Sequence, residues 1–457
     1  MMKTVKFKLF LAKILSPERI FILGFLGVIL LGTILLWFRF SATQRPLTFI
    51  DALFTSTSAV CVTGLASIDI GRDLSFAGQV ITIFLFQIGG LGIITFSTVF
   101  FVLMGRGISF KGRDLVQSTF LPTPRLDFIV ILKSVLWLTL FFESLGILLL
   151  WIRFSFDFPI GHAFYQAIYH AISAFNNCGY SLFSDSLTRY QGDWIVNLTV
   201  MILIVIGGIG FIVQYEIFAK LRRKQKRLSV HTKIVLIVTG FLILGGALGI
   251  YFLEKEHILK GLPLKNQVLA SFFQSVVPRT AGFNTVDIGL LVNETILLMI
   301  ILMFIGASPG STGGGVKTTS AALLFLLIWN GMRGKEEVNI FKRTIPKEVI
   351  SRALAIIFAS GFSIAVITSI LLLTPTGEPG PLESRHLFVE YLFETVSAFG
   401  TVGLSMNLTP KLNDIQKLAI ILMMFVGRVG PLTLAFSLSL NASRKGLRYA
   451  EEGVMVG

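Results

Sequence analysis

The stretch SAFGTVGLSMN, residues 397–407, is a short polar loop centred on a glycine, and it follows an apolar, helix-like run. It lies in a chain of 457 residues that is 54% hydrophobic and only 14% charged, with a mean hydropathy of +0.79. Uncharged runs such as residues 21–38 reach the length of a transmembrane helix, so the composition indicates an integral membrane protein. Polar, irregular backbone is costly in lipid, and this loop therefore calls for an explanation.

Three other stretches resemble this loop, and together they indicate an internal repeat. Each begins as a short amphipathic helix and ends in a glycine loop: FIDALFTSTSAVCVTGL, FYQAIYHAISAFNNCGY, NQVLASFFQSVVPRTAGF and LFVEYLFETVSAFGTVGL. They align without gaps on Gly64, Gly179, Gly282 and Gly403. An aromatic residue recurs at Phe54, Tyr169, Phe272 and Phe393, and a serine recurs one turn later at Ser58, Ser173 and Ser397, with Val276 breaking the pattern. A second glycine cluster follows in each apolar span after the loop.

The short helices of about 12 residues are too short to cross a hydrocarbon core of about 30 Å, but they suit re-entrant segments. The backbone after each must be shielded from lipid, which four loops achieve together by converging on one axis. We therefore predict an all-α integral membrane protein. It has four tandem span–pore-loop–span repeats, with eight transmembrane helices and four re-entrant half-helices, around a pseudo-fourfold pore.

The expected organisation alternates repeats with cytoplasmic segments. The N-terminus is 1–19, repeat 1 is 20–104, a loop is 105–128, repeat 2 is 129–219 and a basic loop is 220–232. Repeat 3 is 233–330 with a gate loop at 306–319, a further loop is 331–348, repeat 4 is 349–441 and the C-terminus is 442–457.

The net charge of +15 is explained by topology. On the arrangement above, 26 of the 40 Lys and Arg residues fall on one side, which the positive-inside rule assigns to the cytoplasm together with both termini. Nucleic-acid binding would need a soluble basic face, and none is expected. The densest basic run, residues 220–227, has two open readings: a topology determinant, or a site for a partner or for anionic lipid.

A ring of four loops whose carbonyl groups face an axis can replace the water around a monovalent cation. Glycine is required because a Cβ would penalise the backbone conformation, and small or β-branched neighbours suit an extended loop. The half-helices direct their partly negative C-terminal ends at the same centre. Cys61 and Cys178 lie beside or within the loops, which favours a packing role near the filter. The predicted filter, with K⁺ at its carbonyl groups, comprises Val62, Thr63, Gly64, Asn177, Cys178, Gly179, Thr280, Ala281, Gly282, Thr401, Val402 and Gly403.

The fourth loop, TVGL at residues 401–404, resembles the TVGYG filter of potassium channels, and the fourfold layout resembles the Ktr/Trk/HKT superfamily of potassium transporters. The length and the absence of extra N-terminal spans fit the bacterial KtrB-type subunit. This resemblance covers residues 20–440. It implies potassium uptake across the bacterial cell membrane, a preference for K⁺ associated with Gly64, a cytosolic ring of KtrA-type nucleotide-binding subunits and a homodimer. It leaves a role for Na⁺ open, and it implies no covalent cofactor.

The stretch GASPGSTGGGVKTT, residues 306–319, interrupts an apolar span and cannot form a straight helix. It either lines the cavity beneath the filter or merely kinks a packed helix; its spacing does not match a phosphate-binding loop. The resemblance implies a gate at this position. Arg428 lies in an otherwise uncharged span, as either a barrier facing the pore or a buried structural contact. The predicted gate residues are Gly306, Ser308, Gly310, Ser311, Thr312, Gly313, Gly314, Gly315, Lys317 and Arg428.

No carboxylate pair, nucleophile constellation or histidine spacing in the sequence suggests an enzyme or a metal site. The leading hypothesis is thus the membrane subunit of a potassium uptake system. The alternative is a sodium-coupled secondary cation transporter; inverted repeats would place the loops on opposite faces of the membrane, whereas the parallel repeats predicted here place all four on one.

Overall fold

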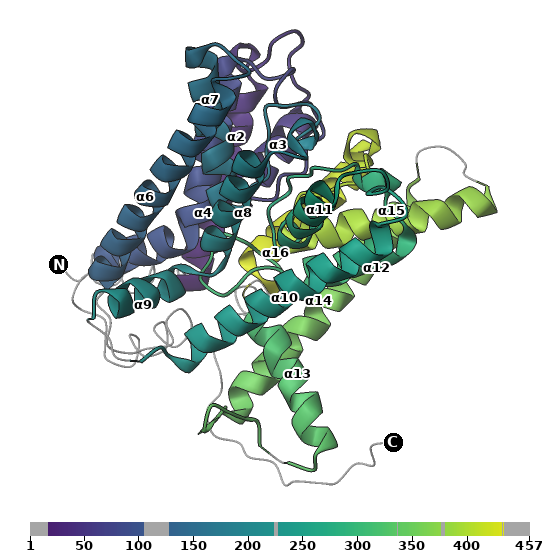
Figure 1. Ribbon diagram of the computed structural model, residues 1–457. Coiled ribbons are helices and arrows are strands. Elements are labelled where there is room, and N and C mark those ends of the chain that lie inside the picture. The colour runs from purple at the N-terminus through teal and green to yellow at the C-terminus, as the bar shows by residue number, and fades with distance from the viewer. Residues whose placement is uncertain are drawn as a thin grey trace, which may run out of the picture.

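The computed structural model describes residues 17–104, 128–223, 227–335, 337–375, 380–431 and 433. Within these ranges the chain is almost entirely helical (Figure 1). A long first helix, a shorter second helix and a third helix follow one another four times, and in the second and third repeats the third helix is broken in two.

The helix bounds follow the chain in order. Repeat 1 has α2 (Pro17–Trp37), α3 (Phe49–Val60) and α4 (Phe76–Met104), and repeat 2 has α6 (Phe128–Phe154), α7 (Ile160–Phe175), α8 (Trp194–Gly208) and α9 (Phe211–Leu221). Repeat 3 has α10 (Val230–Glu254), α11 (Leu264–Val276), α12 (Asn293–Ile305) and α13 (Thr318–Met332), and repeat 4 has α14 (Lys347–Leu373), α15 (Pro381–Gly400) and α16 (Asp414–Val429). Short 3-10 turns are η1 (Arg39–Ser41), η3 (Thr188–Tyr190), η4 (Ile288–Leu290) and η5 (Thr409–Lys411), and a small hairpin pairs β1 (Asn339–Ile340) with β2 (Arg343–Thr344).

The four repeats close into a ring. Within each repeat the first helix packs on both the short helix and the third helix. Between repeats, the third helix of one packs on the short helix of the next: α4 on α7, α8 on α11, α12 on α15 and finally α16 on α3. Because the last contact joins repeat 4 to repeat 1, the short helices surround a common centre.

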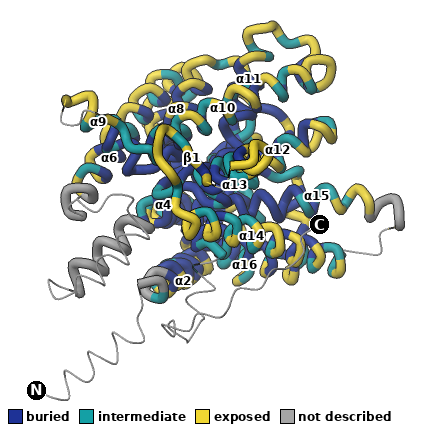
Figure 2. Tube along the Cα trace, turned by 90° about the horizontal axis from the view of Figure 1, so that it is seen from below, coloured by how far each residue is buried: buried dark blue, intermediate teal, exposed yellow. Residues whose placement is uncertain are grey.

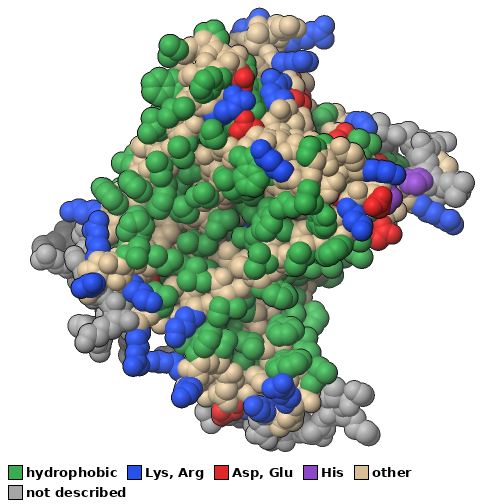
Figure 3. Space-filling model, viewed as in Figure 1, with side chains coloured by type: hydrophobic (Ala, Val, Ile, Leu, Met, Phe, Trp, Pro, Cys, Tyr) green, Lys and Arg blue, Asp and Glu red, His purple; other side chains and the backbone are tan. Residues whose placement is uncertain are grey.

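Hydrophobic side chains cover the outside of this ring as well as its core. Buried residues occupy the middle of the molecule (Figure 2), yet Leu140, Phe241 and Phe362 on the outer helices are 64%, 74% and 72% exposed. Green hydrophobic side chains fill the middle of the surface in Figure 3, while many Lys and Arg residues lie toward its lower end. An apolar exterior of this extent indicates a surface solvated by lipid.

Helix lengths agree with a membrane location. Among the described residues, Lys133–Phe154, Val230–Glu254 and Lys347–Leu373 are long and apolar enough to cross a membrane alone. The pair α8 and α9 would make a fourth span, bent by 101°. Several helix starts are fixed by side chains that accept a backbone N–H of the first turn, as Thr48, Asp193, Ser229 and Asn413 do.

Three features differ from the sequence-based expectations. The short helices have 12, 16, 13 and 20 residues rather than a uniform length near 12. The span expected to be continuous through residues 194–219 bends at Gly210. This glycine has a φ of +94° and lies between the end of α8 and the start of α9. The β1–β2 hairpin was not expected within an all-α chain.

Candidate functional site

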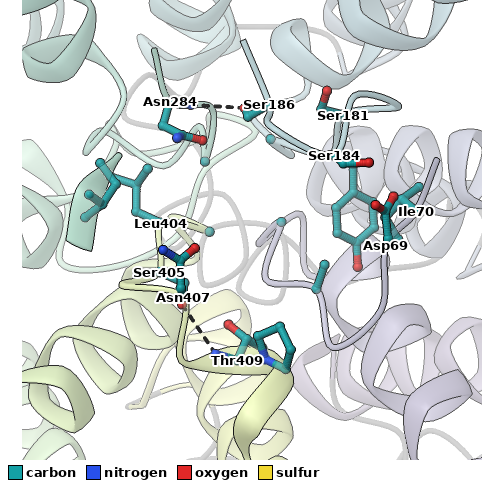
Figure 4. A pocket seen from close by; sticks show the side chains of 18 of the residues that line it. Asp69, Ile70, Ser181, Ser184, Ser186, Asn284, Leu404, Ser405, Asn407 and Thr409 are labelled. Carbon is teal, nitrogen blue, oxygen red and sulfur yellow. Dashed lines mark hydrogen bonds between the residues drawn. The ribbon is translucent and has the colours of Figure 1, made fainter. Parts of the chain in front are cut away.

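The four loop glycines meet at one place. An ideal Cβ added to any of them would strike the backbone of a neighbouring loop, and the φ values of +91°, +81°, +69° and +92° for Gly64, Gly179, Gly282 and Gly403 are all in the region that favours glycine. All four also line one cavity (Figure 4). The sequence alignment therefore identified residues that are neighbours in space, although they are more than 100 positions apart in the chain.

The contacts between these loops run in one direction around the ring. In each case the added Cβ would strike the carbonyl oxygen of the residue just before the glycine of the next repeat. The pairs are Gly64 with Cys178, Gly179 with Ala281, Gly282 with Val402, and Gly403 with Thr63. The carbonyl oxygens of four predicted filter residues are therefore brought together where the loops meet.

A second residue in each loop has a left-handed backbone. It lies two positions before the glycine, and its φ is +57° at Val62, +58° at Asn177, +70° at Thr280 and +50° at Thr401. The expectation of an extended loop was wrong here, and three of the four residues are β-branched, which makes this conformation costly. Strained backbone of this kind persists only where the surrounding structure enforces it. Here the short helices and the neighbouring loops enforce it.

The recurring serines hold the loops to their helices. Ser58 Oγ accepts the Gly64 N–H at 3.1 Å and donates to Leu65 O at 2.7 Å. Ser397 Oγ likewise accepts the Gly403 N–H at 3.1 Å. The sequence shows that this serine recurs, but its partners lie in the irregular loop and could not be read from spacing. Repeat 3 has Val276 instead, and its loop makes a different bond, from the Ala281 N–H to Val277 O at 3.0 Å.

A vestibule of about 310 Å³ lies over the ring of glycines and is lined by polar loop residues (Figure 4). Two carboxylates reach it, Asp69 and Asp287, each five residues after its loop glycine and in opposite repeats. Beside it, hydrogen bonds from Arg189 and Thr188 outweigh the effect of burial and hold the pKa of Asp185 below its ordinary value, so Asp185 offsets the charge of Arg189. The carboxylates of Asp287 and of Asp69, which also pairs with Arg72 at 3.8 Å, favour cations at the mouth of the ring. The sequence analysis missed both aspartates, although their equal spacing was visible.

On the other side of the ring lies the segment between α12 and α13, residues 306–317, which has no helical structure, as expected. It touches three of the four glycine loops. Thr312 Oγ1 donates to Asn177 Oδ1 at 2.9 Å, the Gly314 N–H donates to Thr401 Oγ1 at 2.9 Å, and a Cβ on Gly313 would strike Thr280 Oγ1. This segment therefore lies against the predicted filter residues and does more than bend a helix.

The same segment fills the bend between α8 and α9. The N–H groups of Ser308 and Thr312 donate to Gly208 O and Gly207 O at 3.0 and 3.3 Å, and the Phe211 N–H donates to Gly310 O at 2.9 Å. The bend leaves backbone groups without helical partners, and residues 306–317 supply partners for them. Ser308, Ser311 and Thr312 are all fully buried, whereas Lys317 is half-buried and donates to Gly313 O at 2.7 Å.

Arg428 bridges this segment to repeat 1. Its guanidinium is 97% buried and donates to Thr312 O of the segment and, at 2.6 Å, to Gly89 O of α4. Both partners are carbonyl groups, so the arginine links two repeats without an acidic counterpart. The structure thus shows Arg428 in a buried structural contact with the segment.

One buried polar cluster escaped the sequence analysis. The side chain of Asn176, next to the filter residue Asn177, donates to Gln87 Oε1 at 2.6 Å and to Glu143 Oε1 at 3.2 Å. Glu143 is buried in α6, and as a lone acid in an apolar span it carried the signal that would have revealed it. Among the described residues, no group of three or more His, Cys, Asp or Glu could hold a metal ion, and Cys61 and Cys178 are buried free thiols.

The fold and the site define a multi-pass membrane protein in which four tandem repeats bring re-entrant loops together around one centre. Residues 19–445 match the TrkH family, described as cation transport protein, and the chain belongs to that family.

Related proteins support this assignment. The Ktr system potassium uptake protein B of Bacillus subtilis is 40% identical over 97% of each chain. The potassium/sodium uptake protein NtpJ of Enterococcus hirae is 37% identical over 97% of this chain and 98% of its own. The crystal structure of the potassium transporter TrkH from Vibrio parahaemolyticus superimposes with a TM-score of 0.68 at 22% identity, covering 91% of this chain and 84% of that one. These matches confirm the predicted fold class and the resemblance to KtrB-type transporters.

Proposed function

We propose that this chain is the membrane subunit of a potassium uptake system and that K⁺ crosses at the ring of four glycine loops. The observation that carries the proposal is the closed ring of contacts in which each glycine faces the carbonyl oxygen before the next glycine. Carbonyl oxygens gathered in this way substitute for the hydration shell of a monovalent cation. The names of the two curated relatives, a potassium uptake protein and a potassium/sodium uptake protein, support the same cargo.

In this proposal residues 306–317 form the gate. They occupy the path directly below three filter loops, and Arg428 holds them in place through Thr312 O. Passage requires the segment to move, which breaks the bonds to Gly207, Gly208 and Arg428 together. The positive charge of Arg428 adds an electrostatic barrier to a cation while the segment is in place.

A cytosolic regulator of the KtrA type fits the same scheme, because the gate segment continues directly into α13 and α9 begins at the bend that it fills. A ring of regulatory subunits that shifts either helix would move the segment. The termini and the basic loops would then face the cytoplasm, and two copies of the chain would each contain a complete pore.

Growth of a bacterium that lacks its own K⁺ uptake tests the proposal. We expect the wild-type chain, with its regulator, to restore growth at low K⁺. Gly403→Ser and Gly282→Ser should abolish it, because a Cβ at either position meets the neighbouring loop at a positive φ. Gly240→Ser in α10 is a matched control, since no atom lies within 4 Å of its added Cβ. Rescue by the two filter variants equal to wild type would contradict the proposal.

Sodium coupling is the second candidate, and the name of the Enterococcus hirae relative favours it. Uptake of ⁸⁶Rb⁺ into vesicles with and without a Na⁺ gradient separates the two. A pore predicts a rate independent of the gradient, whereas a coupled transporter predicts uptake against a Rb⁺ gradient that requires Na⁺.

A further inference from the structure

A second cavity, of about 390 Å³, lies far from the vestibule, between α9 and the half of α6 that is remote from the pore mouth. Neither the proposed pore nor the proposed gate uses it. It is lined by Lys133, Ser134, Trp137, Leu138, Tyr215, Phe218, Ala219 and Arg222. It therefore combines basic groups with aromatic side chains at one end of the membrane-spanning region.

The bend after α8 creates this cavity. Because the chain turns by 101° there, α9 leaves the direction of α8 and packs against α6. Tyr215, Phe218 and Arg222 follow at helical spacing and face α6, where Lys133 and Trp137 are one turn apart. The two helices thus present a basic residue each at the same end of the cavity.

The basic end has no acidic lining residue among the part of the chain that the structure describes. Lys133 and Arg222 are exposed, and the Arg222 guanidinium lies 5.8 Å from the centre of the Trp137 ring. The nearest acid on α9, Glu216, is buried and turned toward α10, where it accepts from Thr232 Oγ1 at 2.8 Å. The basic end of the cavity is thus suited to an anionic group held by Lys133 and Arg222.

The other end of the cavity continues into the apolar exterior. Trp137 and Phe141 are stacked at 5.5 Å, and Phe142 contacts Phe218 edge-on at 6.2 Å. Phe141 and its neighbour Leu140 are 45% and 64% exposed on the surface of α6 that faces lipid. A soluble anion would use only the basic end, whereas a molecule with a long hydrocarbon tail would use both.

We propose that this cavity binds an anionic phospholipid, with the phosphate held by Lys133 and Arg222 and one acyl chain lying along Trp137 and Phe141. Basic pockets between membrane helices on the cytoplasmic side suit such headgroups. The assignment to the inner leaflet rests on the proposed orientation, but binding itself does not. The lipid would hold α9 against α6, close to the bend that the gate segment fills.

Native mass spectrometry of the full chain in detergent tests the proposal, with phosphatidylglycerol and phosphatidylcholine of identical acyl chains as probes. We expect the wild type to bind phosphatidylglycerol in preference. The double variant Lys133→Gln/Arg222→Gln should bind phosphatidylglycerol at least about tenfold more weakly than the wild type does. Arg333→Gln is the matched control, because Arg333 also lies over a tryptophan, Trp329 at 4.5 Å, but does not line the cavity.

Three results would overturn the proposal: equal binding of both lipids by the wild type, unchanged binding by the double variant, or an equal loss in Arg333→Gln. Trp137→Leu provides a second test, since it keeps both charges and should weaken retention of either lipid. Loss of response to the regulatory subunit with intact lipid binding in the double variant would assign the cavity to that subunit instead. The ⁸⁶Rb⁺ uptake of the same preparations is measured in parallel, so failure of lipid binding with intact uptake rejects this site alone.

Discussion

In two of the proposed filter loops, a single serine hydroxyl bonds the backbone of the loop glycine. Ser58 and Ser397 each hold the N–H of a loop glycine, which would otherwise be a buried donor without a partner. The loops of repeats 1 and 4, which are direct neighbours in the ring, thereby share the same serine-to-glycine hydrogen bond. Repeat 3 lacks the hydroxyl and takes another path, which makes the ring chemically uneven.

Ser397→Ala should weaken the apparent affinity for K⁺ by about tenfold, because the Gly403 N–H loses its acceptor next to the proposed ion path. Competition of K⁺ with ⁸⁶Rb⁺ uptake measures the change. Ser363→Ala is the matched control, since the Ser363 hydroxyl bonds only Ala359 O of its own helix. Equal affinities for both variants and the wild type would show that the hydroxyl does not shape the ion site.

At this scale the sequence predicted positions better than conformations. The register of the four glycines came from alignment alone, since it depends on side-chain pattern. The left-handed backbone of Val62 and Thr401 could not be predicted, because propensity opposes it and only contacts with other repeats enforce it. The partners of Asn176 in α4 and α6 could not be read from the sequence either, although Glu143 stood out as a lone acid in an apolar span.

Among the elements, the proposed gate segment, residues 306–317, and the bend between α8 and α9 form one hydrogen-bonded unit. The glycines and the proline of residues 306–319 predicted a break in the helix from composition. The bend at Gly210 was not predicted. Glycine content alone does not indicate it, since an equally glycine-rich stretch in repeat 1 stays within the helix α4. The difference is the insertion of a segment from repeat 3, which satisfies the backbone groups that the bend exposes.

Arg428→Ala should raise the rate of ⁸⁶Rb⁺ uptake in the absence of a regulator by about tenfold or more. The variant removes the bonds to Thr312 O and Gly89 O and the positive charge beside the path. Arg428→Lys keeps the charge with fewer donors and should fall between the two. A rate for Arg428→Ala that matches the wild type would count against both the proposed hold of Arg428 on the segment and the proposed electrostatic barrier.

The whole molecule is closed by contacts between its first and last repeats. Lys417 Nζ at the start of α16 lies 2.8 Å from Asp51 Oδ1 in the first turn of α3, and both side chains are largely buried. Helix α16 also packs along α3. The tandem repeats and their orientation could be predicted from the sequence, whereas this pair could not, since it depends on which side chains of the first and last repeats meet when the ring closes.

Removing either partner of this pair should lower the thermal stability of the detergent-solubilised chain. We expect Asp51→Asn and Lys417→Met each to reduce the melting temperature by several degrees, and the double variant to lose less than the sum. A coupling of about 0.5–3 kcal/mol is typical of residues in contact. Strictly additive losses would show that the pair does not hold the ring closed.

The directional packing of the ring has a consequence for biosynthesis. The short helices α7, α11 and α15 are made after the third helices on which they pack, whereas the partner of α3 is α16, which is made only near the end of translation. Until then the ring of the nascent chain is incomplete, and the polar backbone of the first loop lacks neighbours that shield it. Neither the translocon nor lipid can replace those hydrogen-bond partners for long. Ribosome stalling or premature termination within repeat 4 would therefore leave a product that membrane proteases can recognise, which makes the last repeat the checkpoint for quality control.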